Sequence, residues 1–388
     1  MLQKLFVFLL LFLILPDLYL YARYIVRRVT RRSMRILYWI PTFLLTIGLI
    51  HLVCFGNQET TARHAQAIGW FSIFFFLFIA PKLVLTFFGL LGDLLHKCFH
   101  VARTPFTGLG LVVGLFSAFL VFYGAFVGRT RWDVKRVSYT STKLPASFNG
   151  YRIVQLSDIH IGSWQGNEEA IRQLVDRVNA QQPDLIVFTG DLVNHRADEL
   201  NDFQDILSKL EAKDGVYSVL GNHDYGPYFH WKTPQEQADN LSSLKQKEKD
   251  MGWKLLNNEH VIIRHDNDSI ALIGVENDGE PPFSQYADLP KATEGTQGMF
   301  SILLSHNPTH WRREVLPTSD IDIMLSGHTH AMQFIIGKSS PSSLIYPEWK
   351  GMYYEGERAL YVNIGIGYVG LPFRFGAWPE ITVLTLRQ

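Results

Sequence analysis

Five short polar motifs hold the side chains of this sequence that are best suited to catalysis. They are Ser157-Asp158-Ile159-His160, Thr189-Gly190-Asp191, Gly221-Asn222-His223-Asp224, Ser305-His306 and Gly327-His328-Thr329-His330. Each motif follows a hydrophobic run, and together the motifs supply carboxylate, amide and imidazole groups. Oxygen and imidazole nitrogen ligands in this number suit two divalent cations. The motifs therefore predict a metal-dependent hydrolase site.

The hydrophobic runs before the motifs predict strands, and amphipathic stretches between them predict helices. We expect strands at 152–156, 184–188, 215–220, 300–304 and 321–325, and helices at 168–180, 199–210 and 234–250. An edge strand is expected at 133–140, a β meander at 253–275, a loop at 278–298 and closing strands at 359–364 and 381–386. Successive strand–helix units indicate sheets covered by helices, in which ligands bind at the carboxyl ends of strands.

The spacing within the motifs predicts how the side chains converge. Asp158 and His160 lie two residues apart, so a locally extended chain would point both side chains the same way. Gly190 and Gly221 would let the backbone pass close to the metals. Asp191 is the expected bridge, because one carboxylate has two oxygens to offer to two cations.

Together the five motifs resemble the signature of the calcineurin-like metallophosphoesterase superfamily, which reads DxH, GD, GNH[D/E], a lone H and GHxH. The stretch 363–381 also resembles the membrane-associated bacterial branch. The resemblance implies a four-layer αββα sandwich of the α/β class. It implies one metal on Asp158, His160, Asp191 and His330, and a second on Asp191, Asn222, His306 and His328. It further implies that His223 protonates the leaving group, oriented by Asp224.

The resemblance makes Mn or Fe the expected metals, and the same nitrogen and oxygen donors accept Zn. Two such cations activate a hydroxide and neutralise charge on a phosphoryl group. Two further residues are candidates for substrate binding, each with a plainer alternative. His195 could face the substrate or lie in a surface loop, and Arg374 could bind a phosphate or form a surface salt bridge.

The first third of the chain has the composition of a membrane region. Long hydrophobic stretches at 5–26, 36–55, 68–91 and 108–128 predict four transmembrane helices, although the first could instead be a signal peptide. Up to Gly128 the chain has 11 Lys+Arg and 3 Asp+Glu, a balance of +8, which leaves −8 for the remainder. We therefore expect a transmembrane region at 1–128 and a catalytic domain at 129–388. An acidic catalytic domain argues against nucleic acid as a partner.

The positive charges predict the orientation. Arg27, Arg28, Arg31, Arg32 and Arg35 follow the first span, whereas the next loop holds only Arg63. By the positive-inside rule, the arginine-rich loop is cytoplasmic and four spans leave the catalytic domain outside, although the basic residues after the last span, Arg129, Arg131, Lys135 and Arg136, favour the opposite orientation. The charges within the spans, Asp17, Lys82 and Asp93, suit either a transport path or, more simply, side chains that reach the span ends.

These observations predict a multi-pass protein of a bacterial cell membrane that hydrolyses a phosphate ester or anhydride. Tethering favours a phosphate-containing substrate at the membrane, such as a lipid phosphate or lipid-linked diphosphate. A broad phosphodiesterase for small soluble phosphoesters is the alternative within the class. A non-catalytic membrane receptor and a transporter with a regulatory phosphatase domain are alternatives of other classes. Nothing in the sequence indicates an oligomeric state.

Overall fold

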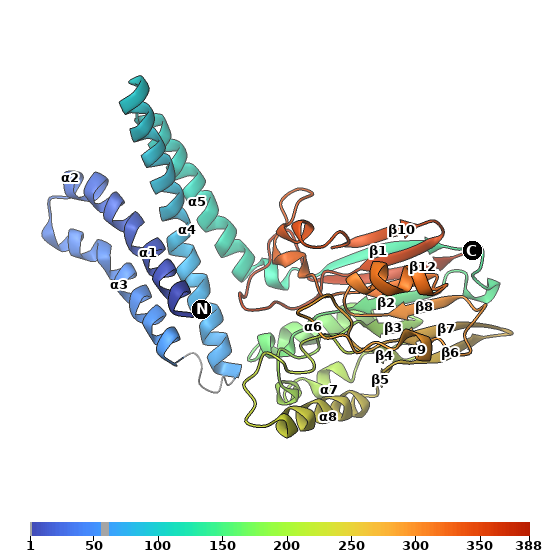
Figure 1. Cartoon of the computed structure of the whole chain (residues 1–388). Coiled ribbons are helices and arrows are strands. Elements are labelled where there is room, and N and C mark those ends of the chain that lie inside the picture. The colour runs from blue at the N-terminus through green and yellow to red at the C-terminus, as the bar shows by residue number, and fades with distance from the viewer. Residues whose placement is uncertain (1, 56–61) are drawn as a thin grey trace. The chain divides into compact units, whose positions relative to one another are not determined.

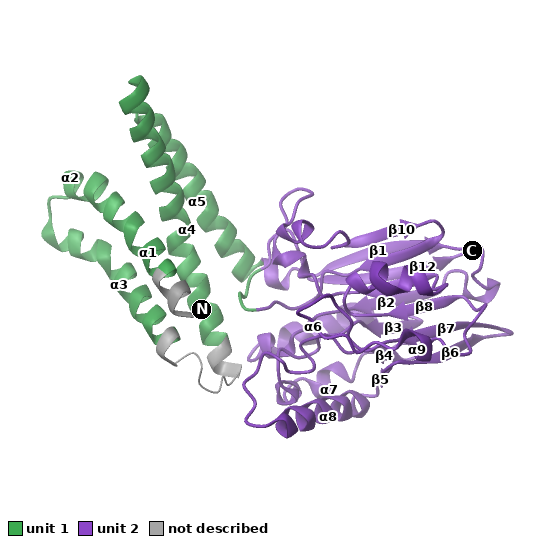
Figure 2. Cartoon of the chain, viewed as in Figure 1, with its two compact units in different colours: residues 1–127, 370–373 green, residues 128–369, 374–388 purple. Residues whose placement is uncertain are grey.

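The protein divides into two compact units in a computed structural model that describes residues 2–55 and 62–388. One unit comprises Met1–Val127 and Gly370–Phe373, and the other comprises Gly128–Val369 and Arg374–Gln388 (Figure 2). The first unit is helical, whereas the second contains both β-sheets (Figure 1). Residues 56–61, in the predicted loop between the second and third spans, lie outside the described residues.

The helical unit confirms the predicted four-span region. Its helices are α1 (Leu2–Leu20), which continues through a π-helical turn at Tyr21–Ile25 into α2 (Val26–Arg28), then α3 (Arg32–Phe55), α4 (Ala62–Phe99) and α5 (Thr104–Phe126). Four segments are long and apolar enough to cross a membrane, at Phe8–Arg28, Arg32–Leu52, Gln66–Phe99 and Thr104–Thr130. Pro16 lies inside α1, so the first helix continues past the proline that ends the apolar run in the sequence. At 38 residues, α4 is longer than the stretch predicted for it.

A buried ion pair lies at the middle of the helical unit. Lys82 Nζ of α4 is 2.8 Å from Asp17 Oδ1 of α1, and the Asp17 side chain is fully buried. Tyr38 and Thr42 of α3 also donate hydrogen bonds to the same carboxylate. The simpler expectation, that Asp17 and Lys82 each reach a span end, is therefore wrong. Within hydrocarbon, pairing the two charges costs less than burying either one alone.

The catalytic unit contains two six-stranded sheets. The strands are β1 (Asp133–Thr140), β2 (Arg152–Leu156), β3 (Leu185–Phe188), β4 (Val216–Ser218), β5 (Lys254–Leu255), β6 (Glu259–His265), β7 (Asp268–Gly274), β8 (Ser301–Leu304), β9 (Ile323–Ser326), β10 (Gly351–Glu355), β11 (Arg358–Val362) and β12 (Glu380–Arg387). The α-helices are α6 (Glu168–Asn179), α7 (Gln204–Leu207), α8 (Pro234–Asp250), α9 (Leu289–Ala292) and α10 (Leu316–Thr318). One sheet has the order β1-β12-β2-β3-β4-β5, and the other β10-β11-β9-β8-β7-β6.

Successive side chains of each buried strand point to opposite faces of its sheet, and this alternation produces the layers. In β2, Ile153 packs into the core between the two sheets, whereas Val154 and Leu156 pack against α6 on the outer face. Ile302 of β8 lies in the same inter-sheet core, and Leu303 faces a third core on the outside of the second sheet. Strands buried on both faces read as continuous hydrophobic runs. The result is the predicted sandwich of two sheets between helical layers, with β1 at a sheet edge as expected (Figure 1).

Three local predictions are wrong. The expected helix at 199–210 is two short pieces, a 3₁₀ turn at Ala197–Leu200 and α7, because the Glu199 carboxylate accepts hydrogen bonds from backbone N–H groups of the preceding residues. The expected meander at 253–275 is divided, since β5 joins one sheet while the β6–β7 hairpin joins the other. The strand β10 was not expected, and α9 lies within the predicted loop at 278–298.

Candidate metal centre

The five motifs meet because each one lies at or just beyond the carboxyl end of a strand. Ser157 follows β2, Thr189 follows β3, Ser305 follows β8 and Gly327 follows β9, while the Gly221 motif begins three residues after β4. Strands β2, β3 and β4 are parallel, and so are β8 and β9, so their carboxyl ends share an edge within each sheet. Backbone hydrogen bonds join the loops at this edge. Asp158 N–H donates to Gly190 O over 2.9 Å, and Gly327 N–H donates to His306 O over 2.9 Å.

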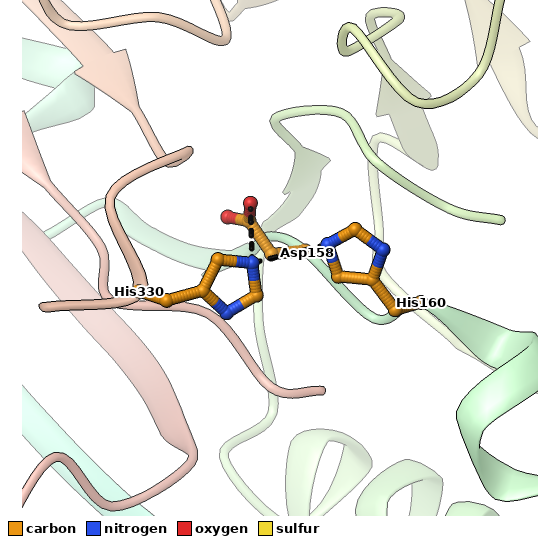
Figure 3. A group of neighbouring side chains, drawn as sticks. All are labelled: Asp158, His160 and His330. Carbon is orange, nitrogen blue, oxygen red and sulfur yellow. Dashed lines mark hydrogen bonds and ion pairs between the residues drawn. The ribbon is translucent and has the colours of Figure 1, made fainter. Parts of the chain in front are cut away.

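Asp158, His160 and His330 form the first cluster of potential ligands (Figure 3). His330 Nε2 lies 3.3 Å from Asp158 Oδ1 and 3.0 Å from His160 Nε2. His160 Nε2 is also 3.6 Å from Asp191 Oδ2. All four side chains are buried, so the ring nitrogens and carboxylates converge away from bulk solvent.

Asp191, His306 and His328 form the second cluster. His306 Nε2 lies 3.3 Å from Asp191 Oδ2 and 3.2 Å from His328 Nδ1. Asn222 is buried, and within the described chain its Oδ1 atom has no hydrogen-bond partner. The same Asp191 oxygen therefore lies within 3.6 Å of nitrogen atoms of both clusters.

The donor atoms of these clusters fit divalent cations. His306 Nδ1 is 2.7 Å from the Thr189 carbonyl oxygen, which can only accept, so Nδ1 carries a proton and Nε2 is the nitrogen that would bind a cation in exchange for its own proton. Such a contact to the outer ring nitrogen is typical of a metal-ligating histidine. The unpartnered Asn222 Oδ1 supplies a further oxygen donor. No thiolate contributes to either described cluster, which makes the set one of nitrogen and oxygen donors.

The electrostatics keep the carboxylates ionised. Burial opposes the charged form of Asp158, but the neighbouring His330 outweighs it and lowers the pKa of the carboxyl. Asp191 behaves in the same way, with His306 as the main opposing charge. Burial lowers the pKa of His328 to about 3, whereas the charge of Asp191 overcomes burial at His306 and raises its pKa to about 9. A cluster with ionised carboxylates attracts cations.

The backbone at these ligands is left-handed. The φ angles are +51° at Asp158, +47° at His160, +59° at Asp191, +73° at His328 and +49° at His330. The expected extended chain between Asp158 and His160 is therefore wrong. Residues with a Cβ seldom adopt this conformation, and such strain is concentrated at functional sites.

Position 190 requires glycine both for its backbone conformation and because there is no space for a Cβ. Its φ angle is +94°, and a Cβ there would lie 2.6 Å from Gly221 N and 2.7 Å from His306 Nδ1. The loops after β3 and β4 thus pass each other at a distance that only glycine allows. This close approach brings Asp191 and Asn222 to the same site.

His223 lies beside the shared carboxylate. Its Nδ1 is 2.8 Å from the Asn194 carbonyl oxygen, so Nδ1 carries a proton and Nε2 is the atom left for the substrate. Its backbone N–H donates to Asp191 Oδ1 over 2.8 Å. The expectation that Asp224 orients His223 is wrong. In the described chain, the hydrogen-bond partner of the His223 ring is the Asn194 carbonyl oxygen.

Asp224 has a different position from the one expected. Its buried carboxylate accepts hydrogen bonds from the backbone N–H groups of Asp191, Leu192, Val193 and Gly221, over 2.8, 2.8, 3.2 and 2.8 Å. It therefore joins the loop after β3 to the loop after β4. Burial, followed by repulsion from Asp191, raises the pKa of Asp224 to about 7.

A cavity of about 350 Å³ opens over the two clusters. Its lining combines Asp191, Asn222, His223, His328 and His330 with Tyr228, Phe283, Thr329, Met332, Gln333, Tyr346 and Val369. Three aromatic members of this lining contact site residues. The Tyr346 hydroxyl is 3.0 Å from His328 Nε2, the Tyr228 hydroxyl accepts from Asn222 Nδ2 over 3.0 Å, and the Phe283 ring centroid is 4.6 Å from that of His328. Sequence reasoning missed all three, because they lie outside the motifs.

The two predicted substrate-binding residues have different surroundings. The His195 ring is partly buried with its centroid 5.9 Å from that of His223, and burial lowers its pKa to about 4. Arg374 is fully buried and does not line the cavity. Its guanidinium donates to the carbonyl oxygens of Gly367, Ala377 and Ile364, and its Nη2 is 3.0 Å from His330 Nδ1. Neither the phosphate contact nor the surface salt bridge expected of Arg374 is therefore correct.

Imidazole and carboxylate side chains that cluster at the strand ends of two facing sheets fit the class of metal-dependent phosphoesterases. Residues 151–332 match the family described as calcineurin-like phosphoesterase, and residues 3–129 match the probable calcineurin-like phosphoesterase transmembrane domain. The chain is 30% identical to a zebrafish (Danio rerio) transmembrane protein with metallophosphoesterase domain, over 97% of this chain and 87% of that protein.

Bacterial proteins are similar over much of the chain as well. The uncharacterized metallophosphoesterase YkuE of Bacillus subtilis is 32% identical over 64% of this chain and 83% of its own length. An uncharacterized metallophosphoesterase of Helicobacter pylori is 30% identical over 80% of each chain. The chain therefore belongs to the calcineurin-like phosphoesterases that carry a four-helix transmembrane domain. It is an integral membrane protein and a metal-dependent phosphoester hydrolase.

Proposed function

We propose that the chain binds two divalent cations that share Asp191. The first site would use Asp158, His160, Asp191 and His330, and the second Asp191, Asn222, His306 and His328. The observation that carries this proposal is the convergence of both clusters on Asp191 Oδ2, at 3.6 Å from His160 Nε2 and 3.3 Å from His306 Nε2. The donors favour Mn or Fe, and Zn is compatible with them.

Bound cations would supply an activated water and neutralise the charge that develops on the phosphoryl group. The chain's own contribution is a positioned proton. Because Asn194 accepts from His223 Nδ1, a protonated His223 can donate from Nε2 to the oxygen that leaves phosphorus. The water oxygen forms a new bond to phosphorus as the bond to the leaving oxygen breaks. His195, beside His223, would contact a more distant part of the substrate.

We further propose that the substrate is a lipid phosphate or a lipid-linked diphosphate. The last membrane span ends at Thr130 and β1 begins at Asp133, so the first strand of the catalytic unit starts within about 10 Å of chain from the membrane helix. Hydrolysis at a membrane surface favours substrates that are held there. Small soluble phosphoesters are the alternative that an assay can distinguish.

The catalytic unit would lie on the outer side of the membrane. The support is the cluster of five arginines after the first span, which favours a cytoplasmic position for that loop. A membrane-impermeant thiol reagent would test the orientation on intact cells that carry Tyr354→Cys, in a chain whose Cys54 and Cys98 are replaced by serine. Labelling only after the cells are opened would contradict an outer position.

The decisive experiment is hydrolysis by the full-length protein after chelation and reloading with Mn, Fe or Zn. The substrates are a nitrophenyl phosphomonoester, a phosphodiester and a lipid-linked diphosphate. We expect metal-dependent turnover that is lost in both His223→Ala and Asp191→Asn, with the highest kcat/KM for the lipid substrate. No turnover by a folded, metal-loaded protein would contradict the proposed reaction, and equal turnover of soluble substrates would contradict the lipid preference.

A further inference from the structure

Large apolar side chains are exposed on two residues of the cavity lining and on three residues close to the lining in sequence. Met332 and Val369 line the cavity and also face solvent. Leu344 is 89% exposed, Ile345 is 61% exposed and Ile336 is 54% exposed. We call these five residues the apolar rim. Exposed apolar groups that gather in one place mark an interaction surface.

The apolar rim is continuous with the cavity along the chain. Ile345 directly precedes Tyr346, whose side chain lines the cavity and contacts His328. The 3₁₀ turns His330–Gln333 and Pro341–Leu344 are joined by a hydrogen bond of 2.6 Å from Ser340 Oγ to Ala331 O. The exposed side chains are therefore held by ordered turns that begin at a candidate metal ligand.

The charge of this segment is unlike that of the rest of the catalytic domain. Residues 331–347 contain one lysine, Lys338, and no Asp or Glu, although residues 129–388 carry a balance of −8. An apolar segment with an isolated cation and without carboxylates suits the boundary between lipid headgroups and hydrocarbon. It does not suit an exposed surface that only has to remain soluble.

The chain also connects the apolar rim directly to the membrane helices. Val369 is followed at once by Gly370–Phe373, which belong to the compact unit of the four spans (Figure 2). Within that unit, Pro372 lies 3.0 Å from the position that a Cβ on Gly69 of α4 would occupy. One peptide bond therefore separates a residue of the cavity wall from a segment packed on a membrane helix.

We propose that the apolar rim receives the hydrocarbon chains of a membrane lipid whose phosphate group enters the cavity. This inference rests on the proposed phosphoesterase function and assigns the part of the protein that selects for a lipid tail. Burial of Leu344, Ile345 and Ile336 against acyl chains removes apolar surface from water, with a gain that grows with the area buried. Short or soluble phosphoesters cannot make this contact.

Contact with lipid is tested without reference to activity. In full-length protein with Cys54 and Cys98 replaced by serine, Leu344→Cys carries a fluorescent label in nanodiscs whose lipids bear a quencher on the acyl chain. Tyr354→Cys, at a side chain that is 56% exposed on β10, is the matched control. We expect at least twofold stronger quenching at position 344. Equal quenching at the two positions, or protection of position 344 only in a dimer, would overturn the proposal.

Selection for the tail is tested by the ratio of kcat/KM for phosphatidic acid with long chains to that for the short-chain form. We expect the Leu344→Ser/Ile345→Ser double variant to lower this ratio about tenfold, and Tyr354→Ser to leave it unchanged. A ratio unaltered by the double variant would overturn the role of the apolar rim. If wild-type protein hydrolyses neither form, phosphatidic acid is excluded as the substrate, the same ratio is measured with long- and short-chain lipid-linked diphosphates, and the quenching result still decides whether the apolar rim contacts lipid.

Discussion

Five residues of the candidate metal centre have a left-handed backbone, and surrounding hydrogen bonds must offset its cost in free energy. They are Asp158, His160, Asp191, His328 and His330. Each such residue costs on the order of 1 kcal/mol relative to a relaxed conformation. The backbone N–H of His328 donates to both Asp158 oxygens, at 3.1 and 3.0 Å, so one ligand holds the loop of another. Hydrogen bonds within the protein therefore organise the candidate ligands.

Asp224→Asn tests the carboxylate that joins two of these loops. An amide offers one acceptor oxygen, so at least two of the four backbone N–H groups would face an NH₂ group or lose their partner. We expect a loss of about 2–6 kcal/mol in the free energy of unfolding, from about 1–3 kcal/mol for each of two unsatisfied buried groups, together with loss of turnover. Thermal unfolding and kcat measure the two effects.

The control for Asp224→Asn is Asp205→Asn, at an exposed carboxylate of α7. If the effect of Asp224→Asn comes from the burial and backbone contacts of Asp224, Asp205→Asn should keep both stability and turnover. Unchanged stability with abolished turnover in Asp224→Asn would instead indicate that the carboxylate acts directly in the reaction.

Arg374→Met tests the guanidinium behind His330. The substitution removes three hydrogen bonds to backbone carbonyls as well as the contact to His330 Nδ1. Residues that support a metal ligand typically contribute about 10–100-fold to metal affinity. We expect a weaker first metal site, measured by metal content after gel filtration and by calorimetric titration.

Arg358→Met is a matched control for Arg374→Met. The Arg358 guanidinium also donates to three backbone carbonyls, those of Ile321, Leu316 and Val315, but it touches no candidate ligand. Both variants should lower the melting temperature, whereas only Arg374→Met should lower the metal content. Equal metal content in the two variants would exclude a supporting role for Arg374.

At the scale of elements, the sequence predicted the strands that precede the motifs better than the pieces between them. Strands such as β3 and β8 are buried on both faces, so their hydrophobic runs are unambiguous. The division of 253–275 between two sheets depends on long-range pairing of β5 with β4, which no local pattern encodes. Likewise, Tyr228, Phe283 and Tyr346 reach the cavity through loop conformations that lie beyond motif spacing.

Glu248→Gln tests how α8 packs on the first sheet. Glu248 is buried and accepts a hydrogen bond from Ser218 of β4, and burial raises its pKa to about 8 from 4.5. The folded protein therefore holds a proton that the unfolded chain releases above pH 4.5, so stability falls as pH rises from about 4.5 to 8. Glutamine cannot lose a proton, and the variant should escape this loss.

We expect Glu248→Gln to match the wild type near pH 5 and to exceed it at pH 8. The difference at pH 8 should be on the order of 2–4 kcal/mol, or several degrees in melting temperature. Melting of the full-length protein in detergent between pH 5 and pH 8 measures it. Asp239→Asn, at an exposed position of the same helix, should follow the wild type at every pH. A parallel pH dependence of Glu248→Gln and wild type would contradict the protonated state.

At the scale of the whole molecule, the two halves differ in what they must bury. The catalytic half hides acidic and imidazole groups beneath sheet edges, whereas the membrane half must assemble helices that gain little from hydrophobic burial in lipid. The polar group shared by three of its helices is Asp17, which contacts Tyr38 and Thr42 of α3 and Lys82 of α4. Such a pair holds the helices together only while both charges are present.

Charge removal at this pair should therefore be non-additive. Asp17→Asn leaves the Lys82 ammonium buried without a counter-charge, and Lys82→Met leaves the Asp17 carboxylate in the same situation. Each should destabilise the helical unit by about 3–5 kcal/mol, the usual cost of breaking a buried pair. The Asp17→Asn/Lys82→Met double variant buries no charge and should recover most of that loss, as read from the melting temperature of the full-length protein.

Arg103→Gln provides the control, because the Arg103 side chain is largely exposed and Asp93 retains its contact with Arg23. Its free energy of unfolding should change by no more than about 0.5 kcal/mol, as for ordinary surface substitutions. A double variant no more stable than the sum of its two single changes would show that the pair does not act by mutual neutralisation. Recovered stability with lost hydrolysis of membrane substrates would instead connect the buried pair to the reaction, since assembly of the helices would then be intact.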